Sequence, residues 1–278
     1  MAAAASSKLG LIAGEGELAS FVAKKASSLG TEVIAISLTG RLDPAVQSAA
    51  AKVYRVDLAD ALSIVSILKA ECVTEAVMIG KVWRAEGFRH RGPAAAVETV
   101  ARGKPHRTDV EILLGFAEKL EEAGIVLVSQ LRYLDDALPQ EGVLGCRAPS
   151  PSEWQDVEFG ARIARLVARA GVGQTVAVKD GAVVAVEAAE GTDAMIRRAG
   201  RIASGCAVVK VSWPGRDERF DIPTVGPGTI EVMRKAKATT LACEAGRTII
   251  VRKRDTIALA DEAGIALVGV SRMRGGKA

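Results

Sequence analysis

The sequence predicts an α/β protein of two domains, the first built on a parallel sheet and the second on a mixed sheet. Short apolar runs alternate with amphipathic runs in the N-terminal part, a pattern typical of strands and helices that form a covered parallel sheet. A segment rich in Pro, Gly and Ser follows at 138–153, and an Asp-Gly turn beyond it marks a β-hairpin. The 278 residues suffice for two domains of ordinary size.

In the N-terminal domain, assigned to residues 1–135, strands and helices are expected to alternate. LGLIA reads as a buried strand, and apolar positions recur at helical spacing from Leu18 onward. Thr108 or Asp109 can cap the helix that begins there. The expected strands are 9–13, 32–37, 53–56, 75–80 and 125–129, and the expected helices are 18–29, 61–70 and 109–123. This alternation predicts a Rossmann-like parallel sheet.

Residues 136–152 are expected to form a linker, and residues 153–278 a C-terminal α/β domain. Ser152, followed by acidic residues and an apolar pattern, predicts the start of a helix that extends to about 170. Asp180 and Gly181 separate two apolar runs, which is the strongest hairpin signal in the chain. The other expected elements are strands at 207–211, 248–251 and 266–270 and helices at 192–201, 227–237 and 254–263. The hairpin among alternating elements predicts a mixed sheet.

Composition indicates a globular cytoplasmic protein, because 49% of the residues are hydrophobic and 25% are charged. The net charge of +4 suits an anionic ligand or a membrane surface, and no nucleic-acid partner is expected. Four separated cysteines and two histidines make a zinc site unexpected and favour a reducing compartment. We expect no signal peptide, because MAAAASSK has no charged region followed by a long apolar run. We also expect no membrane span, since no apolar run reaches roughly 18 residues.

Two segments at the ends of first-domain strands are candidates for phosphate binding. In IAGEGEL, Gly14 and Gly16 allow the backbone to approach an anion at a helix start, and the alternative is a tight turn without a ligand. In IGKVWR, Lys81 and Arg84 can bind phosphate, and the alternative is a solvated loop. Asp109 is expected to cap a helix and can also contact a ligand.

Acidic residues follow the hairpin in EGTDAMIRR, at the start of an expected helix. Glu190 and Asp193 flank Thr192, and Arg197 lies one helical turn later. Acidic residues at a helix start are ordinary partners of the helix dipole, and that is the alternative to a functional role.

The segment FDIPTVGPGTI places Asp221 on backbone that is expected to be rigid, because the residue before a proline is held extended. Thr224 and a glycine follow within a few positions, just before an expected helix. Asp221 together with Asp193 can hold a divalent metal or position a water molecule, and Mg²⁺ prefers carboxylate and substrate oxygens.

These segments together resemble one family. FDIPTVGPGTI, VEAAEGTDAMIRR, GQTVAVKDG, LPQEGVLG and KLGLIAGEGEL are similar, in order and spacing over essentially the whole chain, to the UDP-2,3-diacylglucosamine pyrophosphatases of lipid A synthesis. The resemblance implies magnesium-dependent hydrolysis to UMP and 2,3-diacylglucosamine 1-phosphate, with water attacking the phosphorus next to uridine. It places the family's essential aspartate on Asp221. The family usually has three consecutive glycines at the first turn, so Glu15 is a departure at the position where pyrophosphate contact is expected.

The resemblance also gives a working assignment of the site. Asp221 binds Mg²⁺ or orients the water, with Asp193 or Glu190 as its partner at the metal. The residues expected to bind substrate are Gly14, Gly16, Lys81, Arg84, Asp109, Thr192, Arg197 and Thr224. The expected partner is UDP-2,3-diacylglucosamine at the cytoplasmic face of the inner membrane, which makes the enzyme peripheral there, and a homodimer is left open.

Two other functions compete with this hypothesis. A non-catalytic sensor would bind the nucleotide-sugar lipid without metal-dependent release of UMP. An NAD-dependent dehydrogenase would use the strand-Gly-x-Gly-helix start, but GEGELA lacks the third glycine of a dinucleotide fingerprint.

Overall fold

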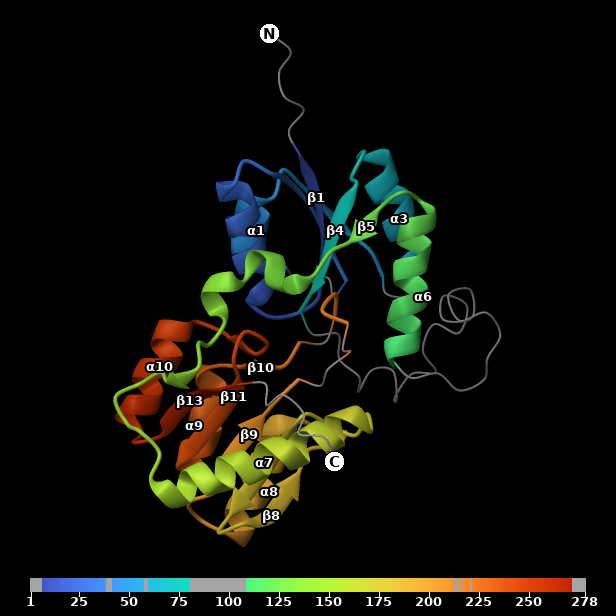
Figure 1. Ribbon diagram of the computed structural model, residues 1–278. Coiled ribbons are helices and arrows are strands. Elements are labelled where there is room, and N and C mark those ends of the chain that lie inside the picture. The colour runs from blue at the N-terminus through green and yellow to red at the C-terminus, as the bar shows by residue number, and fades with distance from the viewer. Residues whose placement is uncertain are drawn as a thin grey trace. The chain divides into compact units, whose positions relative to one another are not determined.

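Figure 1 shows the computed structural model, which describes residues 7–38, 42–57, 60–80, 109–212, 215, 217–220 and 222–271. The chain divides into two compact units, each with its own sheet. The first unit comprises Met1–Leu134 and Glu218–Phe220, and the second comprises Asp135–Asp217 and Asp221–Ala278. The predicted α/β class is confirmed in both units.

Five parallel strands form the sheet of the first unit, in the order β3-β2-β1-β4-β5. This is the order of the first five strands of the doubly wound nucleotide-binding folds. The central strands are continuous apolar runs because both of their faces are covered. The strands are β1 Lys8–Ala13, β2 Glu32–Ser37, β3 Lys52–Arg55, β4 Glu75–Ile79 and β5 Val126–Leu127.

Helices α3 and α6 cover one face of this sheet, and α1 lies on the other (Figure 1). Ile12, Ile36, Leu68 and Leu120 join sheet and helices in one core, which also contains Phe220. The sequence does not predict α2, a short helix that Asp43 caps by accepting a hydrogen bond from the Ala45 N–H at 2.8 Å. The helices are α1 Leu18–Ser28, α2 Pro44–Ala49, α3 Ala61–Ala70 and α6 Asp109–Glu122, followed by the short 3₁₀ helices η2 Gln130–Tyr133 and η3 Asp135–Ala137.

A mixed sheet of six strands forms the second unit, in the order β6-β13-β11-β9-β7-β8. Strands β9, β11 and β13 run parallel, while β6, β7 and β8 each pair antiparallel with a neighbour, so the predicted mixed sheet is confirmed. A separate pair of parallel strands joins β10 to β12. The strands are β6 Gly142–Val143, β7 Thr175–Lys179, β8 Ala182–Val186, β9 Ala207–Lys210, β10 Thr224–Val225, β11 Thr240–Glu244, β12 Ile249–Ile250 and β13 Ala266–Val270.

Helix α7 covers one face of the mixed sheet, and α8, α9 and α10 cover the other. Gly160 lets α7 approach closely, since a Cβ there would lie 2.7 Å from a methyl group of Val209. The helices are α7 Pro151–Arg169, α8 Thr192–Ile202, α9 Pro227–Lys235 and α10 Lys253–Glu262. None of the helices in the described part of the chain is both long and apolar enough to cross a bilayer.

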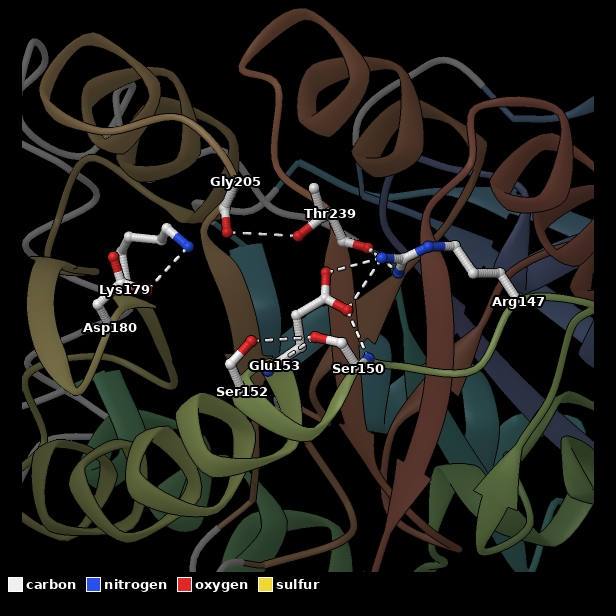
Figure 2. A network of polar contacts seen from close by, with 8 residues as sticks. All are labelled: Arg147, Ser150, Ser152, Glu153, Lys179, Asp180, Gly205 and Thr239. Carbon is white, nitrogen blue, oxygen red and sulfur yellow. Dashed lines mark hydrogen bonds and ion pairs between the residues drawn. The ribbon is translucent and has the colours of Figure 1, made fainter.

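Two expectations for the second unit are wrong in detail. Part of the predicted linker is a strand, because β6 pairs with β13 and so completes the sheet. Helix α7 begins at Pro151 rather than at Ser152, because Ser150 and Glu153 form a reciprocal capping box. Arg147 fixes this start by donating to both Glu153 carboxylate oxygens, at 2.8 and 2.9 Å, and to the Thr239 carbonyl at 2.9 Å (Figure 2).

Candidate functional site

The turn after β1 packs tightly against Gly80, which follows β4. The Gly14 N–H donates to the Ile79 carbonyl at 2.9 Å. Gly80 has a φ of +103°, and a Cβ there would lie 2.8 Å from the Gly14 carbonyl carbon. Two strand ends therefore meet at the carboxyl edge of the first sheet, the edge at which open α/β sheets bind ligands.

The charge of the turn after β1 differs from that of a phosphate-binding loop. The turn carries the carboxylates of Glu15 and Glu17, while Gly16 has a φ of +107° that favours glycine. Binding of a phosphate by Gly14 and Gly16 would therefore depend on backbone N–H groups and not on cations of the turn.

Buried charges gather at the carboxyl edge of the second sheet, where the parallel strands β9 and β11 end. Lys210 closes β9 and is only 5% exposed. Its ammonium donates to the Thr192 hydroxyl at 2.7 Å and to the Thr175 hydroxyl at 3.2 Å, and it lies 3.8 Å from the Glu187 carboxylate. The Thr192 hydroxyl in turn donates to Glu187 at 2.7 Å. These four side chains, which we call the Lys210 cluster, form a polar network at the edge of the second sheet.

Strand pairing explains why the Lys210 cluster assembles. Thr175 begins β7 directly opposite Lys210 in the antiparallel pair, and Glu187 follows the end of β8 on the other side of β7. Burial opposes ionisation of Glu187, but the Lys210 charge and hydrogen bonds from Thr175, Thr192 and the Gln174 N–H outweigh it and lower the pKa of Glu187. The cluster is therefore an ion pair at neutral pH.

A second buried carboxylate ends the neighbouring strand. Glu244 closes β11, is 1% exposed and accepts a hydrogen bond from the Ser212 N–H at 2.9 Å. The Arg165 guanidinium approaches it from α7 at 3.6 Å and also donates to the Ser271 carbonyl at 3.0 Å. Both buried acids at this edge are thus neutralised by cations, which suits a rigid, preorganised frame better than a proton-transferring pair.

The residue expected to be essential, Asp221, lies outside the described residues, as do Lys81 and Arg84. Its sequence neighbours are well defined. Phe220 belongs to the core of the first unit, whereas the Pro223 carbonyl, in the second, accepts a hydrogen bond from the Ile249 N–H at 2.8 Å.

The two expected metal partners of Asp221 lie at the start of α8. Glu190 pairs with Arg198 at 2.6 Å and also accepts from the Ala188 N–H at 3.1 Å, so both of its oxygens have protein partners. Asp193 is exposed in the first turn of α8, as Arg197 is one turn later. Within the described ranges no three His, Cys, Asp or Glu side chains form a metal-binding group. These residues alone do not supply the ligands of a magnesium ion, so the metal set stays a prediction.

The remaining predicted substrate-binding residues fall in different places. Thr192 belongs to the Lys210 cluster, and the Thr224 hydroxyl donates to the Ile222 carbonyl at 3.0 Å. Asp109 is the first residue of α6, and its side chain is outside the described part. Their roles toward a substrate stay predictions.

Lys210 and Glu244 were not among the predicted site residues. The available signal was a charged residue at the end of an apolar strand, in AVVK and in TLACE. A charge in such a position is buried unless the strand frays, so it requires a partner. Strand β11 is absent from the predicted elements, which removed this signal for Glu244.

One curated relative matches almost the whole chain. A curated relative from Caulobacter vibrioides, UDP-2,3-diacylglucosamine pyrophosphatase LpxI, is 29% identical over 274 residues, covering 95% of this chain and 97% of the relative. Among solved structures, a UDP-glucose 4-epimerase from Thermotoga maritima is 18% identical with a TM-score of 0.30 and covers 42% of this chain and 35% of its own. A biotin carboxylase domain bound to ADP is 18% identical with a TM-score of 0.28, over 70% of this chain and 32% of its own. Both TM-scores are too low to support an argument.

Family models match both halves of the chain in order. The LpxI N-terminal domain matches residues 8–137, and the LpxI C-terminal domain matches residues 140–268. The two matches meet within the segment that connects the five-stranded and six-stranded sheets. On these two matches and the near full-length relative, the chain belongs to the LpxI family.

Proposed function

We propose that this protein is a UDP-2,3-diacylglucosamine pyrophosphatase, a hydrolase of lipid A biosynthesis. The observation that carries the proposal is the near full-length match to the Caulobacter vibrioides enzyme together with both LpxI domains. A water oxygen attacks the phosphorus next to uridine, and the bond from that phosphorus to the bridging oxygen breaks. The products are UMP and 2,3-diacylglucosamine 1-phosphate.

Asp221 is the residue proposed to act on the reacting groups, either by orienting the water or by holding a metal. Splitting a pyrophosphate requires an in-line nucleophile and stabilisation of charge on the phosphoryl oxygens. The Lys210 cluster supports this chemistry indirectly, because it fixes Thr192 and the start of α8 at the edge where the parallel strands end.

Magnesium dependence is part of the proposal, and a bound Mg²⁺ would neutralise phosphoryl oxygens. The proposed ligands are Asp221, if it is the group that holds the metal, with Asp193 or Glu190 as its partner, and Glu190 is already paired with Arg198. We also propose that the enzyme works in the cytoplasm, at the inner face of the inner membrane, because its substrate carries two acyl chains.

The test is release of UMP from UDP-2,3-diacylglucosamine by purified protein in H₂¹⁸O, with Mg²⁺ and with EDTA. The proposal expects metal-dependent turnover, with the ¹⁸O label in UMP and none in the sugar phosphate. Label in the sugar phosphate would refute attack at the uridine-side phosphorus. Binding of the substrate with no product from the folded protein would favour a sensor instead.

Substitution separates the role of Asp221 from general effects of lost charge. Asp221→Asn is expected to reduce UMP release by at least about a hundredfold, the size of loss typical for a group that stabilises the transition state. Asp255→Asn removes an exposed carboxylate from the first turn of α10 and is expected to retain activity. Equal activity of the two variants would overturn the assignment of Asp221.

A further inference from the structure

The outward face of α7 carries an apolar and cationic stripe. Phe159, Arg162, Leu166 and Arg169 are spaced by three or four residues, so they lie along one side of the helix. Leu166 is 61% exposed, and Val172, just beyond the helix, is 51% exposed, whereas Phe159 is half-buried and packs against the core beneath α7. The opposite side of α7 packs on the sheet through Val157, Gly160, Ala161, Ala164 and Ala168. We call Phe159, Arg162, Leu166, Arg169 and Val172 together the α7 stripe.

The charges of the α7 stripe are not neutralised by ion pairs within the described residues. Arg162 and Arg169 are exposed. The Arg162 guanidinium lies above the Phe159 ring, 5.7 Å from the ring centroid. Of the carboxylates on α7, Glu153 and Asp156 are buried and hydrogen-bonded, which leaves Glu158 as the exposed acid. The stripe is therefore net positive and apolar together.

We propose that the α7 stripe is a docking surface for a bilayer of anionic phospholipid. Aliphatic side chains beside cations suit an interface that offers acyl chains below and phosphate groups above. Arginine can lay its carbon stem on Leu166 and Phe159 while its guanidinium remains among phosphates. Only the reason for docking rests on the proposed function, which takes a substrate with two acyl chains from a membrane.

The position of the α7 stripe fits this use. Helix α7 begins at the amino edge of the second sheet and ends at its carboxyl edge, because β7 follows it and starts opposite Lys210. Arg169 and Val172 thus lie at the end of the unit that holds the Lys210 cluster. Docking through this end would bring that edge of the sheet toward the lipid.

A second copy of the chain fits the stripe less well. Two copies of α7 that packed against each other about a twofold axis at Leu166 would bring the arginines of one copy toward those of the other. The exposed carboxylate of each α7 is Glu158, which is one negative charge for the two arginines of the stripe. An anionic surface has the complementary charge, and a copy of the same stripe does not.

The test is co-sedimentation of the full-length protein with vesicles of phosphatidylcholine and with vesicles containing roughly a third phosphatidylglycerol. We expect the protein to sediment with the anionic vesicles only, and less so at high salt because exposed charges are screened. Arg162→Gln with Arg169→Gln should weaken binding by about fivefold for each arginine, the factor that corresponds to about 1 kcal/mol. Leu166→Ser should weaken it further.

The matched control is Arg201→Gln with Lys235→Gln. These two cations are exposed and lie at the C-terminal ends of α8 and α9, and Ile202, which follows Arg201, is 64% exposed. The control should bind anionic vesicles as the wild type does. The proposal is overturned if wild type does not sediment, if the control loses binding as much as the stripe variant, or if Leu166→Ser turns a dimer into a monomer in sedimentation velocity.

Catalysis supplies an independent readout. The stripe variants should release UMP at the wild-type rate from substrate dissolved in detergent and more slowly from substrate embedded in anionic vesicles. Vesicle binding needs no turnover, so absence of docking and absence of pyrophosphatase activity are separate results. Equal loss with both substrate forms would refute docking as the cause.

Discussion

Lys210 and Glu187 place an ammonium and a carboxylate 3.8 Å apart inside the second unit, with the Thr192 hydroxyl bonded to both. The Lys210 side chain is 7% exposed and the Glu187 side chain is 12% exposed. Such a pair costs desolvation, but removing one member strands the other in a medium of low dielectric constant. The pair therefore makes the carboxyl edge of the second sheet sensitive to single changes and tolerant of paired ones.

Lys210→Met should lower the free energy of unfolding by about 3–5 kcal/mol, because Glu187 would remain buried without its cation. Lys210→Met with Glu187→Gln should recover much of that loss. Urea unfolding followed by circular dichroism measures both, with Lys235→Met as an exposed control expected to change little. Additive effects of the two buried substitutions would show that the pair does not act as a unit.

Thr192→Val should destabilise the protein by about 1–3 kcal/mol, since it removes the hydroxyl that accepts from Lys210 and donates to Glu187. Thr192→Ser keeps the hydroxyl and should behave like wild type. The measurement is the same unfolding assay together with UMP release. A serine variant as damaged as the valine variant would show that the methyl group of Thr192 matters as much as its hydroxyl.

Acid should weaken the start of α7 through Glu153. Burial opposes its ionisation, but hydrogen bonds from Thr239, the Ser150 N–H and Arg147 outweigh this and lower its pKa from 4.5 to about 2. Its contribution is therefore complete above pH 4.5 and is lost as the pH falls toward 2. Glu153→Gln should cost roughly 2 kcal/mol at neutral pH, and its difference from wild type should shrink below pH 4.5. A difference that stays constant with pH would contradict this account.

Gly80→Ala should destabilise the first unit for two reasons, a steric contact and an unfavourable φ. The loss should therefore exceed the loss caused by φ alone. The new Cβ would meet the Gly14 carbonyl carbon at 2.8 Å, and the φ of +103° disfavours a side chain. Gly124→Ala is the control, because Gly124 has a φ of +81° but nothing within 4 Å of its Cβ position. In thermal unfolding, the melting temperature of Gly80→Ala should be well below that of Gly124→Ala. Equal melting temperatures would refute the close approach of Gly80 to Gly14.

The strands of the first sheet were predictable because each is a single apolar run between helices of clear periodicity. β2 and α3 have the predicted bounds, and β1 differs by one residue. The hairpin of β7 and β8 was equally clear, since Asp180 and Gly181 both adopt positive φ as its turn requires. Local sequence determines these features.

Features that depend on distant partners were not predictable. β6 is two residues long and is a strand because β13 lies beside it, and α7 begins where Ser150 meets Glu153. β11 is a buried strand between two parallel neighbours, but its short apolar run stands close to polar residues on both sides. The Lys210 cluster combines residues from four elements or their ends, so no spacing within the sequence predicts it.

The return of Glu218–Phe220 to the first unit has a consequence for how the protein is made. Phe220 belongs to the same core as Ile12 and Leu120, and the Glu218 carbonyl accepts from the Gln130 N–H at 3.0 Å. During synthesis the core of the first unit is complete only after these residues have left the ribosome, later than the hairpin and α8. A gene cut between the two family domains would yield an N-terminal fragment with a vacancy in its core, so the halves are separable in sequence but not as independent products.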